Sequence, residues 1–186
     1  ARILEAAARL LSGNFLTPVL VGNEAEVKAA AEKAGFNITG APILDPATYE
    51  GMDDMVAKMV ELRKGKMSAE DCRAALSKGN YFGTMLVKMG YADSLLGGAT
   101  YSTADTVRPA LQIVKTKKGS HLVFSCFIMV RGEEKLAMGD CAINLSYEDS
   151  VDKEGNVTVS AARKLAEVAI ETANTAKVFG IEPKVA

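Results

Sequence analysis

The sequence has few residues that could build a metal site, a disulfide framework or a histidine-based catalytic centre. Its three cysteines, Cys72, Cys126 and Cys141, are odd in number and lack CxxC spacing, which argues against a disulfide framework and a structural zinc site. The one histidine, His121, opens an apolar run without a motif partner, so no catalytic dyad is expected there. The low cysteine content favours a reducing, cytoplasmic location.

The chain also lacks a charge excess and a long hydrophobic run. There are 22 basic and 23 acidic residues, which gives a formal net charge of −1. Because no basic stripe is interleaved with aromatic residues, a nucleic-acid partner is not expected. The longest strongly apolar run, residues 122–130, is well below the ~20 residues that a membrane span needs. We therefore expect neither a membrane partner nor a secretory signal.

What is present is typical of an α/β protein. Apolar residues make up 48% of 186, enough for a packed core in one or two domains. A buried strand within residues 17–23, a helix over 24–34 and an extended segment over 36–44 predict a β-α-β unit. This order predicts a three-layer αβα fold with a mostly parallel sheet. Further helices are expected over residues 2–11, 53–64, 68–76 and 80–89, with their methionines in the core.

The pattern changes after a basic linker at residues 115–119. Extended runs over 122–130 and 135–145, separated by Arg131-Gly132-Glu133-Glu134, predict a hairpin. A long helix is expected from about Ser160 to Phe179. We therefore predict a first α/β domain over residues 1–118 and the start of a second over 119–186. Because residues 183–186 look like the first half of a strand and the chain starts without methionine, we expect a fragment of a longer polypeptide.

The segment at residues 97–109, GGATYSTADTVRP, carries the most chemical information. Its glycines allow the backbone to approach a bound group, and it follows a strand-like run that we expect to span residues 94–98. Hydroxyl donors come from Ser102, Thr103 and Thr106.

Proline fits a helix best in its first turn, so Pro109 predicts a helix that begins near Asp105 or Thr106. Arg108 would then lie at the positive end of the helix dipole, a placement disfavoured by roughly 0.3–1 kcal/mol. An arginine placed there predicts a bound anion, most simply phosphate. The alternative is that Asp105 neutralises Arg108 and Ser102 only caps the helix.

Several segments resemble phosphate acetyltransferases. They are NYFGTMLVKMG at residues 80–90, GGATYSTADTVRPALQIVKT at 97–116, DCAIN at 140–144 and FGIEPKVA at 179–186. The resemblance covers essentially the whole chain and is strongest between residues 80 and 116.

The resemblance implies a reversible reaction in which acetyl phosphate and coenzyme A give acetyl-CoA and inorganic phosphate. It implies no metal cofactor, with coenzyme A as a substrate. It also implies two α/β domains separated by a cleft, the second of them incomplete here, in a protein that forms a homodimer when full length. Phosphate butyryltransferase remains an alternative, as does an acetyl-CoA-sensing domain like the one at the C-terminus of some malic enzymes.

Arg108 in the TVRP motif matches a family arginine. Arg63, in ELRKGK, lines up with a second one, the alternative being an exposed arginine at a helix end. The family's catalytic segment of the type Asn-Asp-Leu-Ser-Arg-Gly, with its base aspartate, is absent, so we expect this chain alone to be inactive. Tyr101 stands where many relatives have histidine, which leaves the acyl-chain specificity open.

Overall fold

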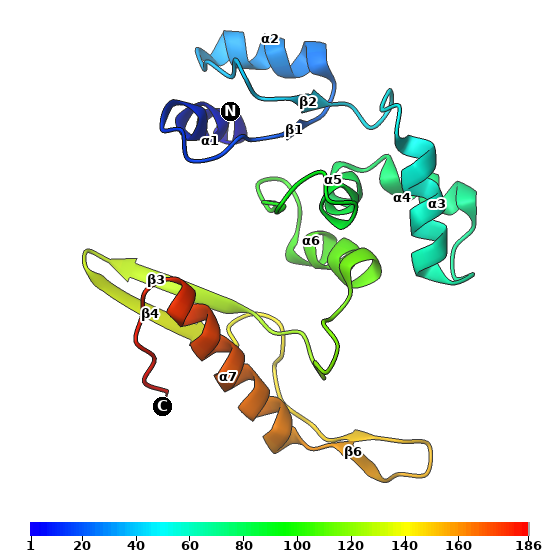
Figure 1. Cartoon of the computed structure of the whole chain (residues 1–186), viewed down its shortest axis with the longest axis vertical. Helices are drawn as coiled ribbons and strands as arrows, with labels where there is room; N and C mark the ends of the chain where they lie inside the picture. The colour runs from blue at the N-terminus through cyan, green and yellow to red at the C-terminus, as the bar shows by residue number, and fades with distance from the viewer. Residues whose placement is uncertain (186) are drawn as a thin grey trace. The chain divides into compact units, whose positions relative to one another are not determined.

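The structure is a computed structural model that describes residues 1–185 and contains two compact units (Figure 1). Unit 1 is Ala1–Lys115, and unit 2 begins at Thr116. The division falls within the basic linker that separates the two sequence patterns.

Unit 1 begins with a parallel β-α-β arrangement. Strands β1 (Leu20–Val21) and β2 (Ile43–Leu44) flank helix α2 (Glu24–Ala34) in the sequence and pair with each other in parallel. The Asn23 side chain accepts a hydrogen bond from Glu26 N at 3.1 Å and thereby caps α2. Gly35 ends the helix with a φ of 73°, a conformation that glycine adopts without strain. The α/β class is confirmed. Within the described residues the strands form three separate two-stranded sheets, of which this pair is parallel and the other two are antiparallel.

The core of unit 1 is built from helices. The other elements are α1 (Arg2–Ser12), α3 (Met52–Arg63), α4 (Ala69–Leu76), α5 (Gly79–Lys88), α6 (Thr103–Pro109) and the π-helix η1 (Ala110–Val114). Met55, Met59, Phe82, Met85 and Ile113 are fully buried in one cluster contributed by α3, α5 and η1. The prediction that the helical methionines fill the core is confirmed for these three, and their unbranched side chains suit an irregular interior.

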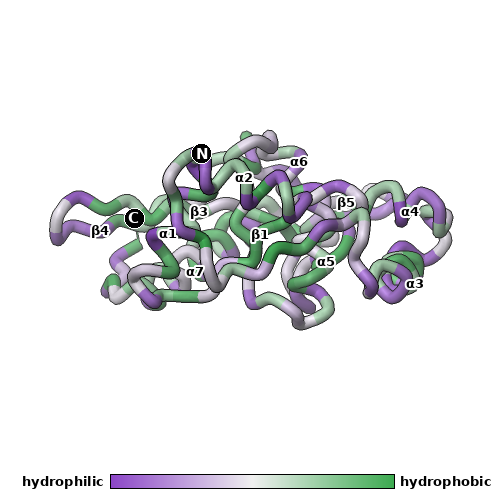
Figure 2. The backbone as a smooth tube through the Cα atoms, turned by 90° about the horizontal axis from the view of Figure 1, so that it is seen from above, coloured by the Kyte–Doolittle hydropathy of each residue, from purple (hydrophilic) through white to green (hydrophobic). Residues whose placement is uncertain are grey.

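Unit 2 consists of two antiparallel hairpins and one long helix. The first hairpin joins β3 (Cys126–Arg131) to β4 (Glu134–Gly139), and its hydrophilic turn is visible beside β4 in Figure 2. The second joins β5 (Ser150–Val151) to β6 (Val157–Val159). Helix α7 (Ala161–Val178) follows, capped by the Ser160 side chain and packed against β4. In the described part of the chain, no helix is both long and apolar enough to cross a membrane.

Three local features differ from the sequence-based expectations. Residues 94–98 form no strand, and Leu96 is 91% exposed there. Residues 183–185 likewise lie outside any strand. The β5–β6 hairpin was not predicted; its turn is organised by the Asp152 carboxylate, which accepts hydrogen bonds from Glu154 N and Asn156 N at 3.0 and 2.8 Å.

Candidate active site

Helix α6 begins earlier than the position of its proline suggests. Ser102 Oγ accepts a hydrogen bond from Asp105 N at 3.1 Å and donates one to Asp105 Oδ2 at 2.7 Å. Ser102 is thus the cap, and the first helical residue is Thr103. The prediction of a start near Asp105 or Thr106 is wrong, because this serine cap satisfies the first amides of the helix one turn before Pro109 could.

Pro109 is the last residue of α6 rather than part of its first turn. Arg108 therefore belongs to the last turn, and the argument that placed it at the positive helix end is wrong. Beyond the proline the chain continues as the π-helix, closed by a hydrogen bond from Lys115 N to Ala110 O at 2.9 Å. An α-to-π junction thus directly follows the candidate arginine, and π-helical turns are frequent at functional sites.

The guanidinium of Arg108 is available to a ligand. Arg108 is exposed and, among residues 1–185, has no hydrogen bond or ion pair. The Asp105 carboxylate is bonded to Ser102 instead, so the predicted alternative of an Asp105–Arg108 pair is not observed. The capping half of that alternative is observed. A guanidinium keeps its charge at all physiological pH values, so it can bind an anion through two parallel hydrogen bonds.

The three predicted hydroxyls differ in their hydrogen bonding. Thr106 Oγ1 donates to Ser102 O at 3.0 Å, so this hydroxyl stabilises the first turn of α6. Ser102 is used as the cap. Thr103 is exposed and, within the described part of the chain, its hydroxyl has no partner. A Cβ added at Gly97 would lie 3.3 Å from Thr106 Cγ2, which explains why glycine suits the loop where it packs on α6.

Arg63, the second predicted arginine, lies in the last turn of α3. Its side chain is half-buried, and its Nε atom is buried without a hydrogen-bond partner in the described residues. Burial and the neighbouring Asp71 carboxylate raise the pKa of the Cys72 thiol, and the charge of Arg63 opposes this shift. No hydrogen bond or shared partner joins Arg63 to Arg108 in the described chain.

Asn80 is a site-adjacent residue that sequence reasoning missed. It is 8% exposed and lies at the start of α5, where its Nδ2 donates to the backbone oxygen of Asp105 at 2.5 Å. Its Oδ1 accepts from Tyr81 N at 3.0 Å. The available signal was a proline inside a helical pattern, because such a proline leaves a carbonyl oxygen in need of another donor.

Asp140 organises the loop that follows β4 in unit 2. Its carboxylate accepts hydrogen bonds from Ser125 N at 2.9 Å, from Ser125 Oγ at 2.5 Å and from the Asn144 side chain. Burial alone would raise the pKa of the Asp140 carboxyl, but these hydrogen bonds outweigh it and hold that pKa far below its usual range. Because its oxygens are occupied by these donors, the Asp140 carboxylate anchors the loop.

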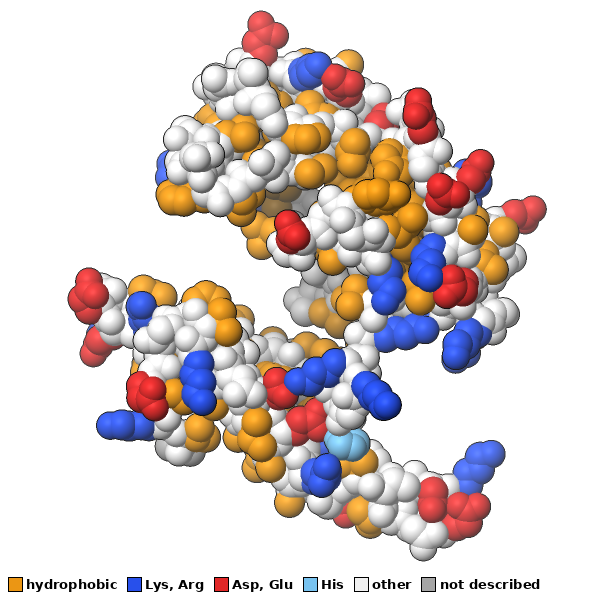
Figure 3. Space-filling view, in the orientation of Figure 1, with side chains coloured by type: hydrophobic (Ala, Val, Ile, Leu, Met, Phe, Trp, Pro, Cys, Tyr) orange, Lys and Arg blue, Asp and Glu red, His pale blue; other side chains and the backbone are white. Residues whose placement is uncertain are grey.

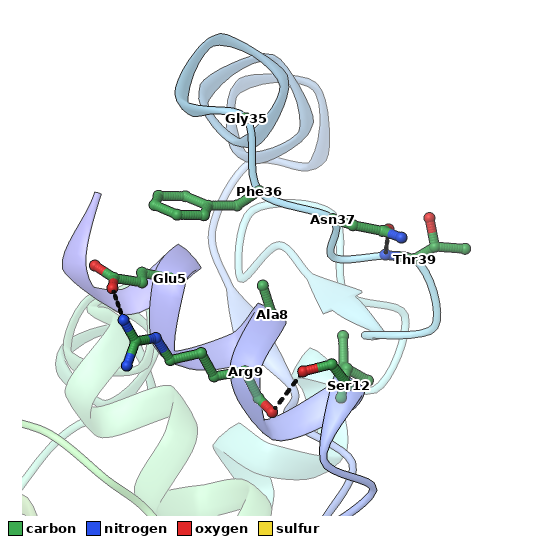
Figure 4. Close-up of a pocket in the computed structure, with 9 residues that line it drawn as sticks. Glu5, Ala8, Arg9, Ser12, Gly35, Phe36, Asn37 and Thr39 are labelled. Carbon is green, nitrogen blue, oxygen red and sulfur yellow. Dashed lines mark hydrogen bonds and ion pairs between the residues drawn. The ribbon is translucent and has the colours of Figure 1, made fainter.

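The open pocket drawn in Figure 4 lies elsewhere in unit 1, between α1 and the segment after α2. It encloses about 500 Å³ and is lined by residues that include Glu5, Arg9, Phe36 and Thr39. Its arginine is already paired with Glu5 at 2.6 Å, and none of the predicted site residues lines it. Because charge and hydroxyl donors gather at α6 instead, we place the candidate site there.

The fold and this site define an α/β protein that presents, among residues 1–185, an arginine and a hydroxyl without partners after a glycine loop. A family model described as phosphate acetyl/butaryl transferase matches residues 1–186, and the chain belongs to this family. Phosphate acetyltransferase from Bacillus subtilis is 52% identical over 185 residues, which is 100% of this chain and 53% of that protein. The same-named protein from Staphylococcus epidermidis is 44% identical, over 100% of this chain and 52% of its own.

Solved structures agree with this assignment. A phosphotransacetylase from Streptococcus pyogenes superposes with a TM-score of 0.84 at 44% identity, covering 98% of this chain and 52% of that one. EutD phosphotransacetylase from Staphylococcus aureus gives a TM-score of 0.81 at 42% identity, with 98% and 51% covered. The chain therefore spans about half the length of the relatives it matches.

Proposed function

We propose that the protein carrying this sequence is a phosphate acetyltransferase, which moves an acetyl group reversibly between acetyl phosphate and coenzyme A. Its membership of the family and the names of its relatives support this activity. The observation that carries the proposal is the exposed guanidinium of Arg108, unpaired among residues 1–185, in the segment that resembles the family most closely.

The chemistry requires a thiolate nucleophile and stabilisation of a departing phosphate. The coenzyme A thiolate attacks the acetyl carbonyl carbon, a C–S bond forms, and the C–O bond to phosphate breaks with its electron pair going to phosphate. Arg108 offsets the negative charge on that phosphate without any change in its own protonation. Thr103 supplies a free hydroxyl donor, whereas Ser102 and Thr106 hold the turn that presents both groups.

The decisive experiment replaces Arg108 by alanine in the full natural chain and measures acetyl-CoA formation. We expect kcat/KM to fall on the order of 10²–10³-fold, the scale for losing a donor to transition-state charge. The matched control is Arg163→Ala, because Arg163 is also an exposed arginine without a partner in the described chain and lies on α7. Equal rates for wild type and Arg108→Ala would remove Arg108 from the site.

Arg63 is proposed as a second phosphate-binding group. Its buried Nε without a partner among residues 1–185 supports this role, because such an atom gains most from a bound anion. Arg63→Lys keeps the charge but loses the planar donor pair, so it separates the two contributions. We expect the KM for phosphate-containing substrates to rise in Arg63→Lys and to rise further in Arg63→Ala. An unchanged KM in both variants would return Arg63 to a purely structural role.

We further propose that the reaction needs no metal or organic cofactor, that the full-length protein is a homodimer and that it acts in the cytoplasm. The resemblance to the family supports the first two proposals, and the sparse cysteines support the third. We expect full activity after treatment with a chelator. We also expect sedimentation of the full chain to give twice the mass of its monomer. Butyryl phosphate in place of acetyl phosphate tests the acyl preference, for which Tyr101→His is the informative variant.

A further inference from the structure

Helix α6, which continues into the π-helix, contains in its first turn a backbone carbonyl that its own helix does not satisfy. In an α-helix, the N–H of residue 109 would donate to the carbonyl oxygen of Asp105, but Pro109 has no N–H. A carbonyl oxygen without a donor destabilises the fold to the extent that it is shielded from water. The structure fills this position with the Asn80 side chain, whose Nδ2 lies 2.5 Å from Asp105 O.

Asn80 is itself held firmly enough to act as a fixed donor. It is 8% exposed, and its Oδ1 is occupied by Tyr81 N at 3.0 Å, which sets the orientation of the amide. Its backbone oxygen accepts from the buried Thr84 hydroxyl at 2.7 Å. The side chain therefore reaches Asp105 from a position on α5 that two further hydrogen bonds define.

We propose that Asn80 is a positioning residue for Arg108: its amide replaces the missing Pro109 N–H and fixes the backbone turn from which the Arg108 guanidinium projects. Arg108 lies between the bonded carbonyl at position 105 and the proline, at the point where the chain changes from α to π geometry. A displacement of about 1 Å at a charged contact can cost ~10²-fold in rate. This proposal rests on the proposed role of Arg108 in phosphate binding.

The test is a set of variants in the full natural chain, assayed with acetyl phosphate and coenzyme A. Asn80→Asp preserves the shape of the side chain and the acceptor for Tyr81 N, but it removes the donor. We expect kcat/KM for acetyl phosphate to fall on the order of 10–100-fold. In the Arg108→Ala background, the same change has little further effect, because a residue that acts through Arg108 loses its influence with it. An equal fall in both backgrounds would overturn the proposal.

Two variants separate positioning from a general structural role. Tyr81→Phe removes another hydrogen bond from α5, between Tyr81 Oη and Gln112 Oε1 at 2.9 Å, without touching the Asp105 carbonyl. We expect this control to affect wild type and Arg108→Ala equally. Pro109→Ala restores the backbone N–H, so Asn80→Asp in that background should have nearly the activity of Pro109→Ala alone. Failure of this rescue would contradict the proposal, and the rescued background also supplies a folded protein if Asn80→Asp alone misfolds.

Thermal unfolding of wild type, Asn80→Asp, Pro109→Ala and the Asn80→Asp, Pro109→Ala double variant distinguishes this inference from the proposed function. If wild type does not turn over acetyl phosphate, the proposed function fails, whereas the coupling between positions 80 and 109 is still measured. We expect Asn80→Asp to lower Tm in the wild-type background and to leave the Tm of Pro109→Ala nearly unchanged. Equal shifts in both backgrounds would show that Asn80 does not replace the proline N–H.

Discussion

Each of the two units of this chain is stabilised internally by a different kind of contact. In unit 1, helices α3, α4, α5 and η1 share a cluster of fully buried side chains. In unit 2, Val168 and Ala176 are the buried apolar residues among those described, while Phe127 and Leu136 are 53% and 59% exposed. Polar contacts, such as the hydrogen bonds that Asp140 accepts from Ser125, order the loop after β4 in unit 2. The space-filling view in Figure 3 shows hydrophobic side chains on the visible face among interspersed acidic and basic ones.

This contrast shows that a segment can form regular secondary structure without burying its apolar side chains in a closed core. The β3–β4 hairpin and α7 form by local pairing and capping, yet they leave one another's apolar side chains partly uncovered. A hydrophobic side chain contributes to stability in proportion to the area it removes from water. Stability within this chain should therefore be concentrated in unit 1.

The largest expected difference between the units comes from removing one aromatic ring in each. Phe82 is fully buried, and its ring meets that of Tyr49 edge to face at 5.1 Å. Phe82→Ala should lower the free energy of unfolding by about 3–5 kcal/mol. Phe127→Ala in the 186-residue chain should change it by no more than about 0.5 kcal/mol. Chemical denaturation of both variants measures the difference, and similar losses would refute the contrast between the units.

A smaller effect is expected at Asp140. Folding lowers the pKa of this carboxyl from its ordinary 3.8, so the ionised form stabilises the folded state. Its contribution is fully present above about pH 5 and is lost as the pH falls below about 4. Asp140→Asn should cost about 1–3 kcal/mol at neutral pH, because it removes a charged acceptor of several hydrogen bonds.

The difference between Asp140→Asn and wild type should shrink as the pH is lowered from 5 to 3. Hydrogen exchange at acidic pH should then show unit 2 opening before unit 1. The opposite order, or a mutational cost independent of pH, would show that this carboxylate does not anchor the loop.

The smallest effects are expected at two matched helix caps. Ser102 caps α6 in unit 1 and Ser160 caps α7 in unit 2, each by accepting an amide hydrogen bond, at 3.1 and 3.2 Å. Replacing either serine by alanine should cost about 1 kcal/mol. Ser102→Ala should in addition weaken phosphate binding, whereas Ser160→Ala should not. Equal activity of the two variants would separate the Ser102 cap from the proposed site.

The sequence predicted the features that depend on neighbouring residues. The β-α-β unit followed from an apolar run, a helical period and Gly35, and α7 followed from Ser160 and Gly180 at its ends. Both were confirmed because caps and periodicity act within a few residues.

The start of α6 was predicted wrongly because the proline was interpreted from local preference alone. The Ser102 cap sets the start of α6, and the bond that replaces the missing Pro109 N–H comes from Asn80, which lies 25 residues away from Asp105 in the sequence. The strand expected at residues 94–98 failed for a similar reason, since a strand needs a partner ladder that its own composition cannot supply. At the candidate site, residue types were predictable, whereas the unpaired state of Arg108 and Arg63 in the described chain was not.

The proline at the end of α6 has a consequence for how this sequence can change over generations. As long as position 109 is proline, any replacement of Asn80 that lacks a donor leaves the Asp105 carbonyl unsatisfied. Once position 109 regains an N–H, position 80 is released from that requirement. On the proposal above, the order in which the proline is lost first is favoured, because losing the asparagine first would leave the Asp105 carbonyl without its side-chain donor.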